Sequence, residues 1–250
     1  MKEQTFLITP IKFFVLALAM VFTIPACDDD DDDVDRKTFT VTIQNVSNAS
    51  TLQVGALPDR TVPLSPGVWA VYDDTDESLF DLDQEANLAT ERQAEEGMND
   101  MKHADLNAAT WVEDNGQFAS SGGADGQIIG SGESVSFTFD AEPGDHLQFM
   151  TMFGQSNDWF YAFSGNGLDL FNGDDPISGD VTSQIALYDA GTELDELPGL
   201  GLTQKVDHPA SIDIGPGDPV DAIKLATSRH TTFVIPATNS VIKVSVVSEN

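Results

Sequence analysis

The chain contains 250 residues, of which 42 are Asp or Glu and 11 are Lys or Arg, and its formal net charge at pH 7 is -31. A surface this acidic is repelled by phosphate backbones and by anionic lipid head groups, so the composition excludes nucleic acid as a partner and favours cations as small ligands. Cys27 is the only cysteine, which excludes a disulfide framework and a multi-cysteine metal site.

Residues 1–26 are predicted to be a lipoprotein signal peptide. Lys2 and Lys12 precede the uninterrupted apolar run Phe13–Ile24. This run is too short to span a bilayer, which needs about 20 residues, but it fits the hydrophobic region of a secretory signal. The run is followed by Pro-Ala and then by Cys27, a sequence that resembles a bacterial lipobox. The resemblance implies cleavage directly before Cys27 and attachment of a lipid to it.

An acidic tether is predicted over residues 27–37, between the lipid anchor and the folded domain. Asp28–Asp33 and Asp35 form a dense block of like charge, which repels itself, cannot bury apolar surface and stays extended. An acidic run directly after a lipidated cysteine resembles the export signal of surface lipoproteins in some bacteria and an inner-membrane retention signal in others. We therefore expect a lipid-anchored protein of the bacterial cell envelope, with the outer membrane or cell surface favoured over the inner membrane.

Residues 38–250 are predicted to form one all-β domain, an antiparallel β-sandwich. In Phe39–Ile43 and Val135–Phe139, apolar side chains alternate with hydroxyl-bearing ones, which is typical of half-buried strands. Gly-, Pro- and Asp-rich turns separate the candidate strands, and all-β domains of 200 to 250 residues are ordinary. Such punctuation favours a sandwich. The further candidate strands are Pro63–Trp69, Leu147–Phe153, Trp159–Phe163, Thr182–Tyr188, Thr232–Ile235 and Val241–Val247.

One segment departs from this strand pattern. Asn87–Lys102 consists mostly of helix-forming residues, with Leu88, Arg92 and Glu95 at helical spacing and Gly97 placed to stop the first turns. We predict a short helical insertion on the sandwich.

Other motifs argue against an enzyme and against an EF-hand. Asp74–Glu85 matches an EF-hand at the first, third, fifth and twelfth positions, but Leu79 stands at the sixth, where the sharp turn needs Gly. An acidic loop leading into a helix is the preferred interpretation. The four histidines show no zinc-binding spacing, and no nucleophile elbow or phosphate-binding loop is present. Acidic pairs are so frequent that spacing neither locates nor rules out a glycosidase dyad.

Two apolar runs lead into loops that carry oxygen ligands. Asp158 follows the first run, and the second run ends in Asp189 with Glu193 four residues further on. Calcium takes six to eight oxygen ligands from loops that can converge on it, and Gly191 lets the chain fold back between the two acids. We predict that Asp158, Asp189 and Glu193 share one Ca²⁺ ion; the alternative is an ordinary solvated acidic turn.

The segments Met152–Phe160 and Leu187–Glu193, in this order and spacing, resemble the spondin domain family, which is found in F-spondin and mindin and in bacterial lipoproteins. The resemblance extends over residues 38–250. It implies a C2-like sandwich of about eight antiparallel strands and calcium ligands at Asp158, Asp189 and Glu193. Glu193 departs from the Asp that is usual in the animal proteins.

The resemblance implies a non-catalytic, calcium-binding interaction or adhesion module on an exported, membrane-anchored protein. The expected partners are calcium, an extracellular glycan or protein ligand, and the membrane through the lipid on Cys27. Two alternatives stay open. One is a carbohydrate-binding module or glycan-active enzyme that uses the acidic loops, and the other is a structural envelope lipoprotein whose metal only stabilises the fold.

Overall fold

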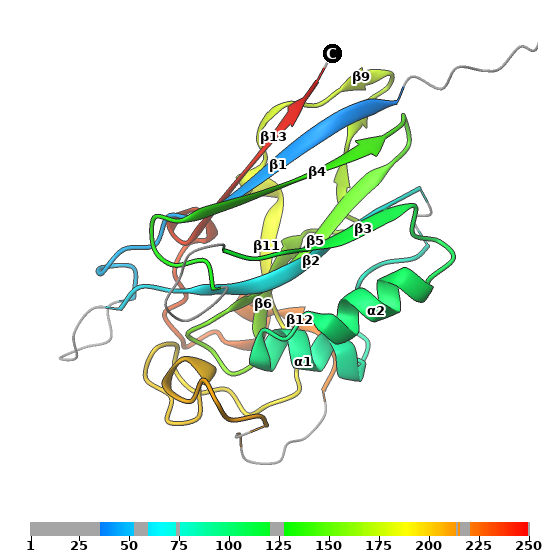
Figure 1. The fold of residues 1–250 in the computed structure, drawn as a ribbon. Helices are drawn as coiled ribbons and strands as arrows, with labels where there is room; N and C mark the ends of the chain where they lie inside the picture. Colours follow the sequence, from blue (N-terminus) through cyan, green and yellow to red (C-terminus); the bar gives the residue numbers. More distant parts are fainter. Residues whose placement is uncertain are drawn as a thin grey trace, which may run out of the picture. The chain divides into compact units, whose positions relative to one another are not determined.

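Two antiparallel sheets packed face to face form the body of the domain (Figure 1). The structure, a computed structural model, describes residues 36–52, 60–73, 76–120, 128–213, 215 and 221–249, all within the unit Val34–Asn250. The signal peptide, Cys27 and the tether up to residue 35 lie outside the described residues. Eight of the strands have five residues or more, and the prediction of an all-β sandwich is confirmed. No helix in the described part of the chain has the length and apolar character needed to cross a bilayer.

The smaller sheet has the strand order β10-β13-β1-β4. Its strands are β1 (Lys37–Asn45), β4 (Ser134–Ala141), β10 (Gly179–Asp180) and β13 (Ile242–Ser248). Phe39, Val41 and Ile43 of β1 are fully buried, while the threonines between them are partly exposed. This is the period-two alternation that the sequence predicts for a sheet with one buried face.

The larger sheet has the order β12-β11-β6-β5-β2-β3, with β7 paired to β5, and a separate hairpin is formed by β8 and β9. Its strands are β2 (Leu64–Tyr72), β3 (Asp114–Phe118), β5 (His146–Phe153), β6 (Trp159–Phe163), β7 (Leu168–Asp169), β11 (Ile185–Asp189) and β12 (Lys224–Leu225), and the hairpin is β8 (Phe171–Asn172) with β9 (Asp175–Pro176). β6 is buried at every position, because both faces of this sheet are covered.

Two apolar clusters cover the two faces of the larger sheet. Between the sheets, the ring of Trp69 on β2 stacks on Phe137 of β4, with centroids 5.1 Å apart. On the outer face, Ala94 and Leu106 from the helices pack in one cluster with Phe160 of β6. Full burial of a large apolar side chain contributes about 1.5–3 kcal/mol, so both layers stabilise the sheet that carries the site.

The helical insertion is confirmed, but it consists of two helices and extends to residue 108. α1 (Leu88–Glu96) begins after Asn87, whose Oδ1 accepts a hydrogen bond from the Thr90 backbone N–H at 2.9 Å, and it ends at Gly97 in the left-handed conformation (φ 66°). α2 (Asp100–Ala108) follows directly. The other helical segments within the described residues are α3 (Ala226–Arg229) and the 3₁₀ turns Thr182–Gln184, Lys205–Asp207 and Thr238–Ser240.

Two strand predictions need correction. Thr232–Ile235 is not a strand: Phe233 and Ile235 pack against the core from a loop, and the Phe233 ring stacks on His230 with centroids 4.6 Å apart. The segment expected as a strand from Thr182 begins with a 3₁₀ turn, and only β11 is extended. In both cases, apolar residues pack on the core and give the alternation expected of a strand, but their backbone does not pair with a neighbouring strand.

Asn45, at the end of β1, tests how far buried hydrogen bonds hold the sandwich together. Its fully buried side chain donates to the backbone oxygens of Val62 (2.8 Å) and Ile129 (2.7 Å) and accepts from the Ser47 N–H. An unsatisfied buried polar group costs about 1–3 kcal/mol. Asn45→Ala should therefore lower the free energy of unfolding in urea by at least about 2 kcal/mol. The control Asn172→Ala, at an exposed site, should change it by less than about 0.5 kcal/mol; equal losses in the two variants would contradict this role.

Candidate metal centre

Pairing of β6 with β11 brings two of the predicted ligands together. The strands run antiparallel, and Asp189 at the end of β11 is paired with Trp159 at the start of β6. Asp158, directly before Trp159, accepts a backbone hydrogen bond from Ala190 at 3.1 Å. The two acidic loops recognised in the sequence therefore leave the same edge of the larger sheet.

Asp158 is fully buried, and its two carboxylate oxygens differ in their surroundings. Oδ2 accepts hydrogen bonds from the backbone N–H of Thr192 (2.7 Å) and Glu193 (3.1 Å), while Oδ1 has no hydrogen-bond partner. Gly191 makes this loop possible, since its φ is +71° and a Cβ there would lie 2.5 Å from the backbone oxygen of Asp221. Asp158 thus fixes the backbone of the loop that carries Glu193.

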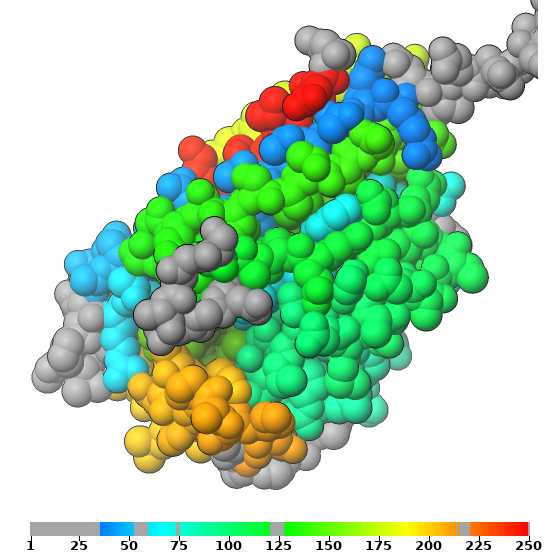
Figure 2. Space-filling model, in the orientation of Figure 1, coloured from blue at the N-terminus to red at the C-terminus, as the bar shows by residue number. Residues whose placement is uncertain are grey.

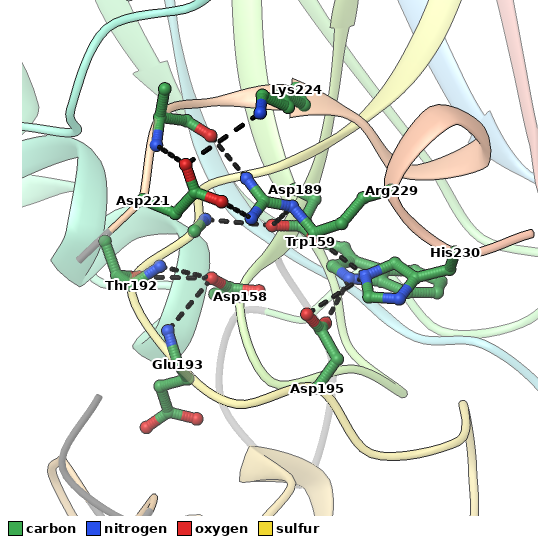
Figure 3. Close-up of polar contacts among 12 residues, drawn as sticks. Asp158, Trp159, Asp189, Thr192, Glu193, Asp195, Asp221, Lys224, Arg229 and His230 are labelled. Atoms are coloured by element: carbon green, nitrogen blue, oxygen red, sulfur yellow. Dashed lines mark hydrogen bonds and ion pairs between the residues drawn. The ribbon is translucent and has the colours of Figure 1, made fainter. Parts of the chain in front are cut away.

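Asp189 is also fully buried, and its carboxylate is held by cationic and neutral nitrogen atoms. Oδ1 accepts a hydrogen bond from the Gly191 N–H at 2.9 Å and lies 3.0 Å from Nε of Arg229. Oδ2 lies 2.6 Å from Nε2 of His230. The guanidinium of Arg229 also reaches Asp221 at 2.8 Å, so one arginine joins two segments of the chain at this edge (Figure 3).

Glu193 is buried, and its carboxylate is directed away from those of Asp158 and Asp189 (Figure 3). Its Oε2 accepts from Nδ2 of Asn157 at 3.1 Å, and its Oε1 accepts from the Gly215 N–H at 3.2 Å. The three predicted ligands therefore belong to the same loops, but their side chains face different neighbours. A single ion shared by all three carboxylates stays a prediction.

The described residues contain two groups of side chains whose ligand atoms lie within 4.8 Å of one another, and each group could hold a metal ion. The histidine group consists of Asp189, Asp195 and His230, and the carboxylate group consists of Glu95, Glu193 and Asp213. Asp189 thus belongs to one group and Glu193 to the other. Asp158 lies near both, because its charge acts on Asp195 and on Glu95.

The sequence did not indicate Glu95, Asp195, Asp213 or His230 as site residues. Glu95 lies on α1, 5 % exposed, and its Oε2 has no hydrogen-bond partner; the nearest cation is Nη1 of Arg92 at 3.8 Å. In the sequence, the only indication of Glu95 is its position: the spacing of apolar residues in the predicted helix places this acid on the side that faces the domain. Asp195 accepts from Nε1 of Trp159 at 2.5 Å. Asp195 lies two residues after Glu193, the end of the motif recognised in the sequence. Acidic residues are so frequent in this segment that the sequence does not distinguish Asp195 from the others.

Burial and mutual repulsion raise the pKa of several of these carboxyl groups. Burial raises the pKa of Glu95 to about 8, and the charges of Glu193 and Asp158 add to this effect. The pKa of Asp158 is raised by burial and then by the charge of Asp189. The pKa of Asp195 is raised by burial and then by the charges of Asp158 and Asp189. A bound cation would offset both causes.

The metal-free domain should lose stability as pH rises. Glu95, Asp158 and Asp195 have raised pKa values, so in the folded state they keep protons that the unfolded chain has already released. Each such group lowers the free energy of unfolding by about 1.4 kcal/mol per pH unit between its unfolded and folded pKa. The melting temperature of chelator-treated protein should therefore fall between about pH 5 and about pH 8, with a shallower slope in Glu95→Gln. A melting temperature that rises across this range would contradict the assignment.

No protein-family model and no curated protein matches this chain. The spondin resemblance rests on the residues of Met152–Phe160 and Leu187–Glu193. In the structure these two segments are adjacent, because β6 and β11 pair and the loop after β11 donates two backbone hydrogen bonds to Asp158. Membership of the spondin family stays a prediction.

Proposed function

We propose that this chain is a non-catalytic, calcium-dependent interaction module of the spondin type, exported and held in the bacterial cell envelope by a lipid on Cys27. The observation that carries the calcium part is the carboxylate group, in which Glu95, Glu193 and Asp213 offer three oxygens within 4.8 Å of one another. Glu95 comes from α1 and the other two come from loops. One ion at this point would tie the helical insertion to the sandwich.

The chemistry of the carboxylate group suits a hard cation. All three side chains offer oxygen only, which is the ligand type that calcium and magnesium prefer. Oε2 of Glu95 is buried without a hydrogen-bond partner, and an ionised oxygen in that state is costly unless a cation reaches it. Asp213 is exposed, so water can complete the coordination shell of the six to eight oxygens that calcium takes.

Asp158 and Asp189 act on the loop in this proposal. Oδ2 of Asp158 accepts the amides of Thr192 and Glu193, and Oδ1 of Asp189 accepts the amide of Gly191. These three hydrogen bonds fix the backbone directly before the Glu193 side chain. The predicted triad therefore contributes one ligand and two positioning residues.

The segment that follows Glu193 offers a surface for a partner. Its residues expose large apolar side chains at several positions, and the most exposed is Leu202 at 82 %. Figure 2 shows this segment, coloured yellow to orange, as a continuous surface beside the helices. In this proposal, these side chains contribute to the surface that contacts the partner. The others are Leu194, Leu197, Val206 and Ile212.

Calcium should raise the melting temperature of the soluble chain that begins at Asp28, and EGTA should reverse the effect. At a calcium concentration about 100-fold above Kd, binding adds about 2.7 kcal/mol, which corresponds to about 5–10 °C for a domain of this size. Glu193→Gln and Glu95→Gln should remove this shift because each replaces a ligand. The matched control Asp174→Asn, at an exposed acid in a turn, should retain it. An unchanged melting temperature with calcium, or a full shift in Glu193→Gln, would refute the calcium proposal.

The interaction role is tested on whole cells that carry the full chain. If calcium fixes a binding surface, EGTA treatment and Glu193→Gln should each reduce attachment to matrix-coated and glycan-coated surfaces by at least about 10-fold, the effect of losing about 1.4 kcal/mol. Attachment is compared after correction for the amount of protein on the surface. If Glu193→Gln lowers the melting temperature and leaves attachment unchanged, the metal is structural and the module does not act in adhesion.

A further inference from the structure

Three carboxylates near β6 and β11 have similar surroundings. In each of them, one oxygen atom contacts backbone or side-chain nitrogen atoms, and the other oxygen atom does not take part in these contacts. Oδ2 of Asp158 accepts two backbone amides. Oδ1 of Asp189 faces Gly191 N–H and Arg229 Nε, and Oδ1 of Asp195 accepts from Trp159 Nε1. Outer hydrogen bonds of this kind orient the ligands of metal sites.

The second oxygens of Asp189 and Asp195 meet at one imidazole nitrogen. Nε2 of His230 lies 2.6 Å from Oδ2 of Asp189 and 3.0 Å from Oδ2 of Asp195. The ring is fixed between Trp159, with centroids 5.2 Å apart, and Phe233, with centroids 4.6 Å apart. Nε2 is therefore held at the point on which the two carboxylates converge (Figure 3).

The remaining oxygen of Asp158 supplies an independent indication of a ligand. Oδ1 has no hydrogen-bond partner, and the residue is fully buried. Figure 3 shows Asp158 beside Asp189, with its other oxygen joined to the amides of Thr192 and Glu193. A buried carboxylate oxygen without a partner is costly, and a metal ion is one of the few ligands that would satisfy it.

We propose that Asp189 Oδ2, Asp195 Oδ2 and His230 Nε2, whose residues form one group of ligand atoms within 4.8 Å of one another, bind one divalent transition-metal ion of the zinc class, with water as the fourth ligand. This site is distinct from the carboxylate group of Glu95, Glu193 and Asp213, and it does not depend on calcium binding there. Imidazole together with carboxylates suits zinc, manganese, iron or cobalt, whereas calcium takes oxygen ligands.

The two separations at Nε2 of His230 require only a small adjustment. Zinc bonds of about 2.0–2.2 Å in a tetrahedron separate the ligand atoms by about 3.3–3.6 Å. The present separations of 2.6 and 3.0 Å would widen by less than about 1 Å on binding. To bind the metal through Nε2, the neutral ring of His230 must carry its hydrogen on Nδ1, so no net loss of a proton from the neutral ring is needed. Three carboxylates and Arg229 give the surroundings a formal charge of about -2, which a divalent ion neutralises.

Two of the proposed ligands, Asp195 and His230, can be reached from solvent. A cavity of about 420 Å³ is lined by Asp195, Arg229, His230 and Phe233, among others. Its volume exceeds that of a hydrated ion, so the ion can enter with part of its water shell. The transition-metal site therefore has ligands, outer hydrogen bonds and access, the features expected of a functional metal site.

Cobalt titration of tag-free soluble chain, stripped with a chelator, tests the proposal. Co²⁺ should give the visible absorption bands of a four-coordinate ion, and Zn²⁺ should abolish them at one equivalent. His230→Ala and Asp195→Asn should weaken binding at least about 100-fold, and Trp159→Phe, which removes an outer hydrogen bond, about 10–100-fold. His103→Ala, on α2, is the matched control and should bind as the wild type does. Glu95→Gln should leave the cobalt spectrum unchanged, which separates this site from the proposed calcium site.

Absence of cobalt bands in the wild type, or equal affinity in His230→Ala, would overturn the proposal. Near-ultraviolet circular dichroism establishes that each variant is folded. If His230→Ala does not fold, nitrogen-detected imidazole signals of the wild type decide the question. Zinc should then shift Nε2 of one histidine and leave the other three unchanged; shifts at several surface histidines, or at none, would refute the site.

Discussion

The site depends on one interaction, the acceptance of the Thr192 and Glu193 amides by the buried carboxylate of Asp158. Asp158 precedes β6 and the amides follow β11, so the contact continues the pairing of these strands beyond the last residue of the sheet. Burial strengthens hydrogen bonds to an ionised oxygen and at the same time makes the ionised oxygen costly. The loop is therefore held well only when something else stabilises the charge on Asp158.

The helical insertion has a role in this arrangement because it carries Glu95 to the loop. α1 is capped at Asn87 and Gly97, and Gln93 of α1 donates to the backbone oxygen of Pro66 at 2.9 Å, which joins the helix to β2. These contacts fix the position of the helix, from which Glu95 lies near Glu193. Packing of Ala94 and Leu106 on the outer face of the larger sheet is what positions a carboxylate of the candidate calcium site.

Local sequence patterns predicted the sandwich, the insertion and the two acidic loops, and each of these depends on residues close together in the chain. The alternation in Phe39–Ile43 is read from five neighbours, and Gly97 stops a helix by its own conformation. Glu95 and His230 could not be found in this way, because they reach the site from α1 and from the loop after α3. Their contacts are non-local. Helical spacing places Glu95 on an inward side of its helix without marking it as a ligand, and nothing adjacent to His230 in the sequence differs from an ordinary surface histidine. The strand predicted around Phe233 was wrong for the same reason. In the sequence, an apolar residue that packs on the core and on His230 from a loop cannot be distinguished from one that belongs to a strand.

The distribution of cations explains why this end of an acidic protein suits metal ions. Only nine Lys or Arg residues follow Asp35, and four of them lie here: Arg92 near Glu95, Lys205 on Glu96, Arg229 on Asp189 and Lys224 near Asp221. Among the described residues, none of the ion pairs within 4.0 Å involves Asp158, although it is the carboxylate that lies near both groups. A protein cation large enough to reach Oδ1 would have to be buried beside Trp159. A metal ion provides more charge in less volume, so it can neutralise this carboxylate without disturbing the aromatic packing around it.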